Sequence, residues 1–363
     1  MSSTLTTDLG GGVVTDLSRE LAGTHESVKV FRDEATGLHA IVALHNTVRG
    51  PALGGTRFFA FESDAAALND VLRLSEGMTY KATAAGLPLG GGKAVIVGEP
   101  ATIKTPELLR AYGRFVDSFA GSYITAGDVG TTSSDMDHIG ESTKWVVGRN
   151  ATKGGSGDSG YSTALGVFTA MAAAASTIWG SEGLTGRSVG VEGAGKVGKQ
   201  LITMLLETGA DVVLAESHPA SLQRALTEHP GIRIAPSVID AEVDVYAPCA
   251  MGATLNPKTV PSIQARLVCG AANNQLLNAD VENQLAAQEV LWVPDYVANA
   301  GGLIQVASEI DVIQPDEVGM RIGHIGLTVT EILRIALERS TTPGNAAYTL
   351  VRTRLGAGRK EQP

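Results

Sequence analysis

Apolar residues in the first part of the chain follow two different periods. Alternate positions are apolar in two runs, which predicts two half-buried strands. These runs contain Val28 and Val30, then Leu38, Ala40, Val42 and Leu44. After Ser63-Asp64, a pair typical of a helix N-cap, apolar positions recur every three or four residues instead. This period predicts an amphipathic helix whose apolar stripe, Val71, Leu74 and Met78, ends at Lys81.

The segment that follows predicts short elements separated by glycine. Glycines at 90–92 precede a short apolar strand at 94–97, and Thr105-Pro106 marks the start of a helix. Another strand is predicted at 122–125 and ends at Gly127-Asp128. Small and polar residues at 154–157 then indicate a domain boundary.

Beyond residue 160, short strands alternate with helices. A long apolar helix is predicted at 164–178 and an amphipathic helix at 315–339. Residues 342–344, Thr-Pro-Gly, separate the second helix from a last short one. Strands are predicted between the two long helices at 188–192, 211–216, 232–235, 243–247, 266–270 and 290–293. This alternation indicates an α/β fold with a parallel, doubly wound sheet.

Length and charge limit the possible classes of protein. The chain has 363 residues, more than one hydrophobic core usually organises. We therefore expect one domain at 1–148, joined by a C-terminal helix at about 343–363, and a second domain at 149–342. A net charge of −10 opposes binding to a phosphate backbone, so no nucleic-acid partner is expected. Because we find no run of about 18 apolar residues, we also expect no membrane span.

The cysteines and the N-terminus suggest a reducing compartment. Cys249 and Cys269 are the two cysteines of the chain, and no histidine ligand stands near either, so we expect buried thiols and no metal site. The N-terminus lacks a basic region followed by an apolar core, as a signal peptide would have. We therefore expect a cytoplasmic protein.

A glycine-rich turn is the most specific cofactor signal. Residues 193–198 read Gly-Ala-Gly-Lys-Val-Gly, between a predicted strand and an apolar helix at 201–206. In this context the glycines permit a tight turn, the approach of a pyrophosphate and close helix packing, and the helix N-terminus attracts the anion. Glu216 ends the next strand, where an acid accepts ribose hydroxyls and repels a 2′-phosphate. We therefore predict NAD as cofactor; an ordinary turn and a surface acid are the alternatives.

Three charged residues form a candidate reacting centre. Lys81 ends the apolar helix stripe, Lys93 follows the three glycines, and Asp128 lies at the tip of a strand. Taken singly, lysines often extend to water and aspartates often cap turns. Taken together in apolar and glycine-lined segments, they favour a catalytic cluster. A lysine removed from water beside a second lysine should have a lowered pKa and act as a base.

Several segments resemble the glutamate/leucine/phenylalanine/valine dehydrogenase superfamily, in particular its shorter leucine, valine and phenylalanine branch. They stand in the family order at 50–57 (GPALGGTR), 78–81 (MTYK), 87–93 (LPLGGGK), 270–274 (GAANN) and 295–302 (DYVANAGG). The resemblance implies an N-terminal domain for substrate binding and homo-oligomerisation, a Rossmann domain for NAD, and a cleft between them. The implied reaction is the reversible oxidative deamination of an L-amino acid to a 2-keto acid and ammonia.

The resemblance also implies roles for single residues. Lys81 would hold the substrate carboxylate, Lys93 would stabilise the carbonyl oxygen or activate water, and Asp128 would transfer protons. The implied substrate-binding residues besides Lys81 are Leu53, Gly54, Gly55, Met78, Ala126, Asn274, Leu303 and Val306. The implied cofactor-binding residues are Gly193, Gly195, Lys196, Val197, Gly198, Glu216, Ala250, Asn274 and Asn299.

The same comparison of residues favours an apolar substrate side chain. Glutamate dehydrogenases carry a lysine in place of Leu53 and a hydroxyl in place of Val306, so here a distal carboxylate would lack partners. Ala126 resembles the leucine and valine enzymes, whereas Leu303 resembles the phenylalanine enzymes. We expect a branched aliphatic substrate. Phenylalanine or an unusual larger amino acid is the first alternative, and a non-catalytic NAD-binding homologue is the second.

Overall fold

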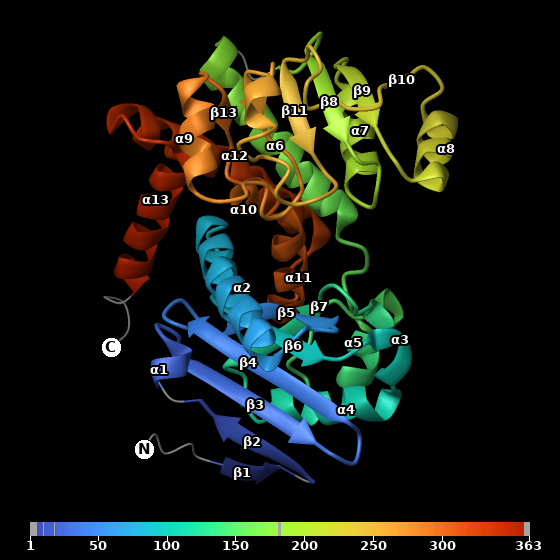
Figure 1. Ribbon diagram of the computed structural model, residues 1–363, viewed down its shortest axis with the longest axis vertical. Helices are drawn as coiled ribbons and strands as arrows, with labels where there is room; N and C mark the ends of the chain where they lie inside the picture. Colours follow the sequence, from blue (N-terminus) through green and yellow to red (C-terminus); the bar gives the residue numbers. More distant parts are fainter. Residues whose placement is uncertain (1–5, 10, 18, 181–182, 359–363) are drawn as a thin grey trace. The chain divides into compact units, whose positions relative to one another are not determined.

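The computed structural model describes residues 6–9, 11–17, 19–180 and 183–358 (Figure 1). The chain divides into two compact units. Unit 1 contains the described residues of 1–158, 306–313 and 353–363, and unit 2 contains those of 159–305 and 314–352. The domain limits that we predict from the sequence, 148/149 and 342/343, stay a prediction.

Unit 1 is built on a mixed sheet of seven strands in the order β1-β2-β3-β4-β6-β5-β7. The strands are β1 (Thr6–Leu9), β2 (Gly12–Asp16), β3 (Ser27–Asp33), β4 (Leu38–Asn46), β5 (Ala52–Phe59), β6 (Gly90–Val97) and β7 (Tyr123–Gly127). Neighbours from β1 to β6 pair antiparallel, whereas β5 pairs parallel with both β6 and β7. The strands predicted at 27–46 are confirmed as β3 and β4; β1, β2 and β5 were not predicted.

Different helices cover the two sides of this sheet, since alternate residues of a strand face opposite sides. Val42 of β4 packs in one apolar cluster with Phe115 of α4 (Pro106–Asp117). The next residue, Ala43, packs in another cluster with Val71 of α2 (Asp64–Ala84). Lys93 of β6 lies directly opposite Ala43, so its side chain is on the α2 side. Figure 1 shows α2 lying across β4 and β6. The other helices of this part are α1 (Arg19–Ala22), α3 (Pro100–Ile103), α5 (Ser133–Ile139) and a short 3-10 helix (Ala151–Lys153).

Helix α2 begins at the predicted cap, but its buried face is not the predicted stripe. The Ser63 hydroxyl accepts a hydrogen bond from Ala66 N at 3.1 Å. The buried residues are Ala67, Val71, Ser75, Thr79, Ala82, Thr83 and Ala84, while Leu74, Met78 and Lys81 are half-buried. The Ser75 and Thr79 hydroxyls are buried because ring nitrogens of His25 and His45 each lie 2.8 Å from one of them. Partnered hydroxyls thus occupy a face where the apolar period predicts leucine and methionine.

The glycines at 90–92 belong to strand β6 itself, not to a turn before it. They let neighbouring backbones approach closely, as does a glycine of β5. A Cβ on Gly54 would lie 1.7 Å from the Gly92 carbonyl oxygen, and a Cβ on Gly91 would lie 2.0 Å from Thr79 N. A larger residue at either position would therefore push α2 or β5 away from β6.

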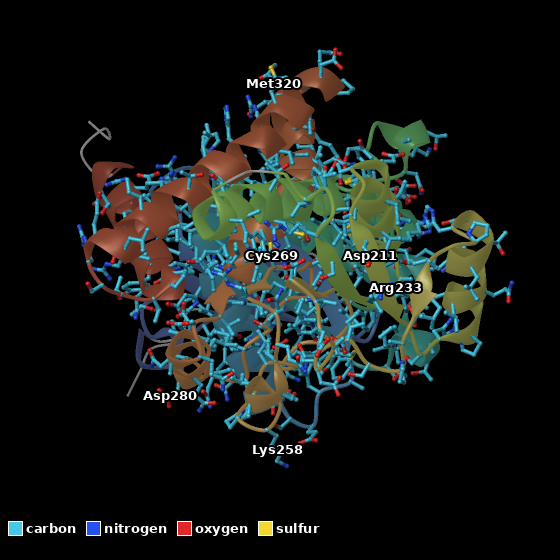
Figure 2. The ribbon with its side chains drawn as sticks, turned by 90° about the horizontal axis from the view of Figure 1, so that it is seen from above. Asp211, Arg233, Lys258, Cys269, Asp280 and Met320 are labelled. Atoms are coloured by element: carbon cyan, nitrogen blue, oxygen red, sulfur yellow. The ribbon has the colours of Figure 1, made fainter. Side chains whose placement is uncertain are left out.

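Unit 2 has a parallel sheet of six strands in the order β10-β9-β8-β11-β12-β13. The strands are β8 (Ser188–Glu192), β9 (Asp211–Ala215), β10 (Arg233–Ile234), β11 (Val245–Pro248), β12 (Leu267–Val268) and β13 (Leu291–Trp292). This is the strand order of a Rossmann fold, with the switch point between β8 and β11. All six predicted strands are confirmed. On β9 and β10, Asp211 and Arg233 form an exposed ion pair, with Arg233 Nε 3.1 Å from Asp211 Oδ1 (Figure 2).

The helices from residue 160 onward complete the described part of the chain. They are α6 (Gly160–Trp179), α7 (Gly198–Glu207), α8 (Pro219–Glu228), a 3-10 helix (Val260–Ser262), α9 (Asp280–Ala287), α10 (Asp295–Ala298), α11 (Gly301–Asp311), α12 (Pro315–Glu338) and α13 (Pro343–Gly358). Helix α6 is long and apolar enough to cross a membrane by length and composition. It packs against α7 and α12, and the core helix of a folded protein meets the same criterion. We predict this helix at 164–178 from the sequence but do not count it as a candidate membrane span, because serine and threonine interrupt its apolar run.

Two glycine-to-alanine substitutions should change stability in opposite directions. Gly54→Ala should lower the free energy of unfolding by about 3 kcal/mol or more, because the new Cβ meets backbone that cannot move independently. Gly77→Ala, within α2 and with nothing within 4 Å of the added Cβ, should raise it by about 0.5–1 kcal/mol. Urea unfolding of both variants measures the difference. A Gly54→Ala protein as stable as the wild type would contradict the close approach of β5 and β6.

Candidate active site

The candidate reacting centre in unit 1 is a buried ion pair between Lys93 of β6 and Asp128, the residue that follows β7. Lys93 Nζ lies 2.8 Å from Asp128 Oδ2. The Lys93 side chain is 7% exposed and that of Asp128 is 24% exposed, so water reaches the pair mainly on the Asp128 side. A pair so removed from bulk water interacts strongly, and losing either partner would leave an uncompensated charge.

The register of the strands explains why these two side chains meet. Gly55 of β5 pairs with Ala126 of β7, and Thr56 of β5 pairs with Ala94 of β6. Lys93 and Asp128 consequently extend to the same side of the sheet from the two strands that flank β5. Gly55 between them has no side chain; a Cβ there would lie 2.9 Å from Asp128 Cβ and 2.8 Å from the Gly127 carbonyl oxygen. The glycine makes room for the aspartate.

The charges around the pair change the pKa of both members. Burial lowers the pKa of Lys93, although the charge of Asp128 and its hydrogen bond act in the opposite direction. Burial alone would raise the pKa of Asp128, but the charge and hydrogen bond of Lys93, with the charge of Arg57, together hold it below its ordinary value. Asp128 is therefore ionised at neutral pH, and Lys93 loses its proton more easily than a lysine in water.

A network of buried hydroxyls on the other side of the sheet fixes β5 against β7. Thr56 Oγ1 lies 2.7 Å from Tyr112 OH and 2.6 Å from Thr125 Oγ1. Tyr123 OH donates to the Gly54 carbonyl oxygen at 2.8 Å. Burial raises the pKa of both tyrosines, so they stay neutral hydroxyl groups. The network holds the backbone that carries Gly55, Ala126 and Asp128.

The other sequence-predicted residues of unit 1 differ in exposure and position. Lys81 and Met78 are half-buried on α2, which packs on the same side of the sheet as Lys93. Ala126 is 8% exposed and Leu53 1% exposed. Val306 is half-buried on α11. Leu53 and Ala126 share the strand parity of Gly55 and Asp128, so both extend toward α2. The structure thus brings Lys93 and Asp128 into contact and places the substrate-pocket candidates of β5, β7 and α2 on the same side of the sheet.

In unit 2 the glycine turn joins β8 to α7, as predicted. Gly193 has φ +94°, and a Cβ on Gly198 would lie 1.9 Å from the Gly193 carbonyl oxygen, so these two glycines serve the fold itself. A Cβ on Gly195 would meet no atom within 4 Å. Gly195 and Lys196 are exposed and Val197 is half-buried. Since protein packing does not require glycine at 195, the open space there fits a bound group such as a pyrophosphate at the helix N-terminus.

Glu216 is held beside this turn. Its Oε2 accepts a hydrogen bond from Ala194 N at 2.7 Å, and its Oε1 accepts one from His218 N at 2.7 Å. Each carboxylate oxygen retains a second lone pair that could accept a ribose hydroxyl. Ala250, after β11, lies on the other side of the switch point: a Cβ on Gly193 would be 2.9 Å from the Ala250 Cβ.

An asparagine cluster follows strand β12. The Asn299 amide donates to the Ala271 carbonyl oxygen at 3.1 Å and to Asn273 Oδ1 at 2.7 Å. Asn299 is 3% exposed, and its Oδ1 finds no hydrogen-bond donor among the described residues, so it fits an added ligand that donates one. The exposed Asn274 has φ +52°, a conformation rare outside glycine and frequent at functional sites. Leu303, at the start of α11, is 8% exposed.

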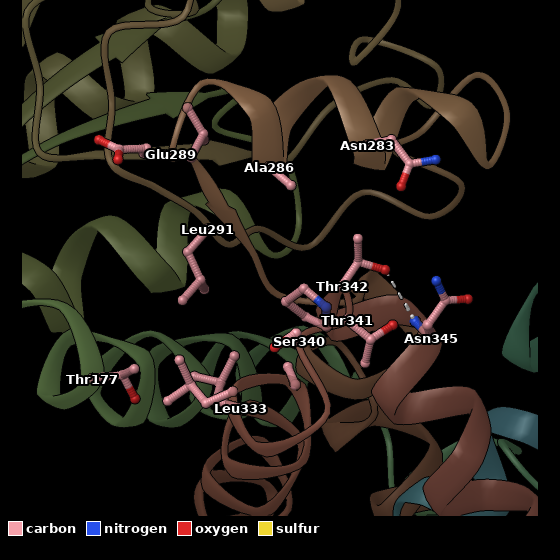
Figure 3. Close-up of a pocket in the computed structure, with 14 residues that line it drawn as sticks. Thr177, Asn283, Ala286, Glu289, Leu291, Leu333, Ser340, Thr341, Thr342 and Asn345 are labelled. Atoms are coloured by element: carbon pink, nitrogen blue, oxygen red, sulfur yellow. Dashed lines mark hydrogen bonds between the residues drawn. The ribbon is translucent and has the colours of Figure 1, made fainter.

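A separate cavity of about 640 Å³ lies between the ends of α6 and α12, α9 and β13 (Figure 3). Its wall includes Thr177, Leu291 and Leu333 and the turn before α13. None of the sequence-predicted site residues lines it. Cys269 is buried and Cys249 half-buried, and within the described residues no group of three or more histidine, cysteine, aspartate or glutamate side chains is arranged to hold a metal ion.

Sequence reasoning missed three polar residues of these sites. Arg57 Nε lies 3.2 Å from Asp128 Oδ2, and Arg57 NH1 lies 2.7 Å from Asp70 Oδ2. Asn273 Oδ1 accepts from the Asn299 amide. The signal for Arg57 was present in the sequence, since it is the one charged residue of strand β5. Asp70 and Asn273 carry no such signal, because an acid on a helix and an asparagine in a loop are ordinary.

Two family models of known proteins match this chain, one within unit 1 and the other mostly within unit 2. The family model of the Glu/Leu/Phe/Val dehydrogenase dimerisation domain matches residues 23–145. The model of the glutamate/leucine/phenylalanine/valine dehydrogenase domain matches residues 214–318. The first match contains Lys81, Lys93 and Asp128, and the second contains Glu216 and the asparagine cluster.

Individual relatives match almost the whole chain. The valine dehydrogenase of Streptomyces virginiae is 45% identical over 360 residues, 97% of this chain and 100% of the relative. The phenylalanine dehydrogenase of Caldalkalibacillus thermarum is 42% identical over 337 residues, 91% of each chain. The crystal structure of L-tryptophan dehydrogenase from Nostoc punctiforme superposes with a TM-score of 0.83 at 39% identity, covering 94% of this chain and 98% of that chain. The two sites therefore occur in a chain that belongs to the glutamate/leucine/phenylalanine/valine dehydrogenase family of amino-acid dehydrogenases.

Proposed function

We propose that the enzyme catalyses the reversible, NAD-dependent oxidative deamination of a branched-chain L-amino acid of the valine or leucine type. The observation that carries the proposal is the buried contact of 2.8 Å between Lys93 Nζ and Asp128 Oδ2. It supplies a base and a proton carrier in one place, as water addition to an iminium carbon requires. Similarity to a valine dehydrogenase over the full chain supports the branched-chain substrate.

The residues of unit 1 divide the chemistry between them. When bound, the nicotinamide cofactor accepts a hydride from the substrate α-carbon, which leaves an iminium group. Lys81 holds the substrate carboxylate as a point charge. Neutral Lys93 takes a proton from water as the water oxygen bonds to the iminium carbon. Asp128 takes that proton from Lys93 and returns it to the amino group. Lys93, neutral again, takes the hydroxyl proton as the carbon–nitrogen bond breaks, which forms the keto carbonyl and releases ammonia.

The lowered pKa of Lys93 gives the reaction its pH dependence. The base must be neutral to accept a proton, so the rate of oxidative deamination rises with pH through the pKa of Lys93. Because burial lowers this pKa, the rise occurs at a lower pH than for a lysine in water. Asp128 remains ionised below this range, since its pKa is held down by Lys93 and Arg57 against the opposing effect of burial.

For the cofactor, a dehydrogenase of this family implies a nicotinamide dinucleotide, and we propose NAD rather than NADP. The Glu216 carboxylate beside the glycine turn supports this choice, since its charge would repel a 2′-phosphate. Asn299 Oδ1, Asn274 and Ala250 would complete the nicotinamide end of the site, with Gly195 leaving space for the pyrophosphate. We also propose a homo-oligomer formed through unit 1, which contains the segment matched by the dimerisation-domain model.

A larger apolar amino acid is the second candidate substrate. Leu303 favours it, as do the phenylalanine and tryptophan dehydrogenases among the similar proteins. Ala126 favours the branched aliphatic class. A difference of one methylene in such a pocket changes the free energy by only about 1–3 kcal/mol, so activity should fall gradually across this series.

A panel of keto acids tests the substrate. Initial rates of NADH oxidation with ammonia should be highest with the keto acids of valine and leucine, and lower with those of phenylalanine and tryptophan. The keto acid of glutamate should give kcat/KM lower by at least about a hundredfold. Leu53 is buried and Val306 is half-buried, and neither apolar side chain offers the distal carboxylate a partner. The same rates with NADPH should be much lower. Preference for the aromatic keto acids would assign the second candidate instead.

Replacing the proposed base tests the chemistry. Lys93→Ala should lower kcat by about 10²–10⁴-fold, the usual contribution of a general base, and leave the Kd of NADH unchanged. Intrinsic fluorescence titration with NADH measures binding, and near-ultraviolet circular dichroism verifies the fold. A kcat within about tenfold of the wild type, or ~1.4 kcal/mol, would remove Lys93 from the catalytic role.

Two glycines of the turn separate cofactor binding from folding. Gly195→Ala should keep the melting temperature and weaken NADH binding by about tenfold or more, because the new methyl group occupies the open space. Gly198→Ala should lower the melting temperature, since its Cβ meets the Gly193 carbonyl oxygen. Gly319→Ala, on α12 with nothing within 4 Å, is the control for both measurements. Unchanged NADH affinity in Gly195→Ala would place the pyrophosphate elsewhere.

A further inference from the structure

Arg57 is a charged residue in a strand whose other members are apolar, glycine or threonine. Its side chain is 23% exposed and lies between two carboxylates. Nε is 3.2 Å from Asp128 Oδ2, and NH1 is 2.7 Å from Asp70 Oδ2. The planar guanidinium can bridge two acids in a fixed geometry, which an ammonium group cannot do.

The strand register places this arginine beside the proposed reacting pair. Arg57 pairs with Val95 of β6, two residues after Lys93, so both side chains extend toward α2. Arg57 and Lys93 approach the same carboxylate oxygen, Asp128 Oδ2. Two donors on one oxygen fix the direction in which the carboxylate points.

Asp70 anchors Arg57 from helix α2. Its side chain is 15% exposed and also contacts Arg73 NH2, at 3.1 Å from Oδ1. Lys81, the proposed anchor of the substrate carboxylate, follows Asp70 by eleven residues, which is about three helical turns. Asp70 and Lys81 consequently lie on the same face of α2, and this face turns toward the side chains of β5, β6 and β7 that carry the proposed chemistry.

We propose that Arg57, held in place by Asp70, is a positioning residue that orients the Asp128 carboxylate toward Lys93 for deamination. The proposal rests on the proposed function, since it assigns Arg57 a part in that reaction. Arg57 acts through Asp128, whose Oδ2 it shares with Lys93. Without the guanidinium, Asp128 would keep one cation and could rotate about its Cα–Cβ and Cβ–Cγ bonds.

The charges that face Lys93 come from three elements. Burial has the largest effect and lowers the pKa of Lys93. Asp128, just after β7, and Asp70 of α2 raise this pKa, whereas Arg57 of β5 lowers it further. Strand β4 places uncharged Ala43 opposite Lys93. On α2, Lys81 is a cation on the same face as Asp70. Removing Arg57 should therefore move the rising limb of the pH–rate profile to higher pH. Removing the Asp70 charge should move it to lower pH.

These opposite shifts form the test. Full pH profiles of kcat and kcat/KM are measured for wild type, Arg57→Gln and Asp70→Asn, with the amino acid that the wild type oxidises best. We expect Arg57→Gln to lower kcat by about ten- to a hundredfold, the cost of a misplaced catalytic group, with KM for NAD unchanged. Its rising limb should shift to alkaline pH and that of Asp70→Asn to acid pH. Arg57→Lys keeps the charge but not the bridge, so it should retain the wild-type limb with a reduced kcat.

A matched control and the contrary outcomes keep the test decisive. Arg110→Gln removes another arginine of unit 1 that bonds Glu141 and Glu107 at the surface, and should leave both rate and profile unchanged. An Arg57→Gln enzyme with a lower rate but an unshifted limb would mean that Arg57 only ties β5 to α2, and the proposal would fall. A shift in the same direction for Asp70→Asn would also overturn it. If the wild type oxidises no amino acid at any pH, the proposed function fails instead, before any variant is compared.

Discussion

The structure of unit 1 depends on a lysine and an aspartate that contact each other where water has little access. Placing two charges there is costly, and their attraction offsets the cost only if the geometry is held closely. The surrounding fold supplies that geometry. Gly55 leaves space for Asp128, the hydroxyls of Thr56, Tyr112 and Thr125 join β5 to β7, and the mixed sheet sets the register. Chemistry at this pair is therefore a property of the whole sheet and not of two residues.

The two units carry different parts of the proposed reaction. Unit 1 contains the ion pair and the candidate residues for the substrate, while unit 2 contains the glycine turn, Glu216 and the asparagine cluster. In unit 2 the sheet serves a different purpose. Strands β8 and β11 flank the switch point, and in the proposed function the loops beyond them present backbone and short side chains to the cofactor. Helix α11 contributes residues to both units, with Leu303 in one and Val306 in the other.

Sequence patterns predicted the elements of unit 2 better than those of unit 1. A parallel sheet buried on both faces has short, uninterrupted apolar strands, and each was found within one or two residues. Strand β5 was missed because Gly54, Gly55, Thr56 and Arg57 break any apolar period, and β1 and β2 were missed because their residues are mixed. The apolar stripe of α2 was misplaced, since the buried face uses Ser75 and Thr79, whose hydroxyls are satisfied by histidines distant in sequence.

Lys93 and Asp128 could be predicted from glycine context and family resemblance. The contacts of Arg57 with Asp128 and of Asn273 with Asn299 could not be predicted, because they join strands, helices and loops that are distant in the sequence.

The backbone contacts of Gly54 and Gly91 restrict how this enzyme can diverge. Neither position can gain a side chain without displacing a neighbouring strand or helix, so substitution at these two glycines is not a route to a new substrate preference. In the proposed pocket, changes in substrate size would come from Ala126 of β7, from Met78 of α2 or from the start of α11. New substrate preferences can therefore evolve around an unchanged reacting pair, by a few substitutions on surfaces that the sheet does not need for its own packing.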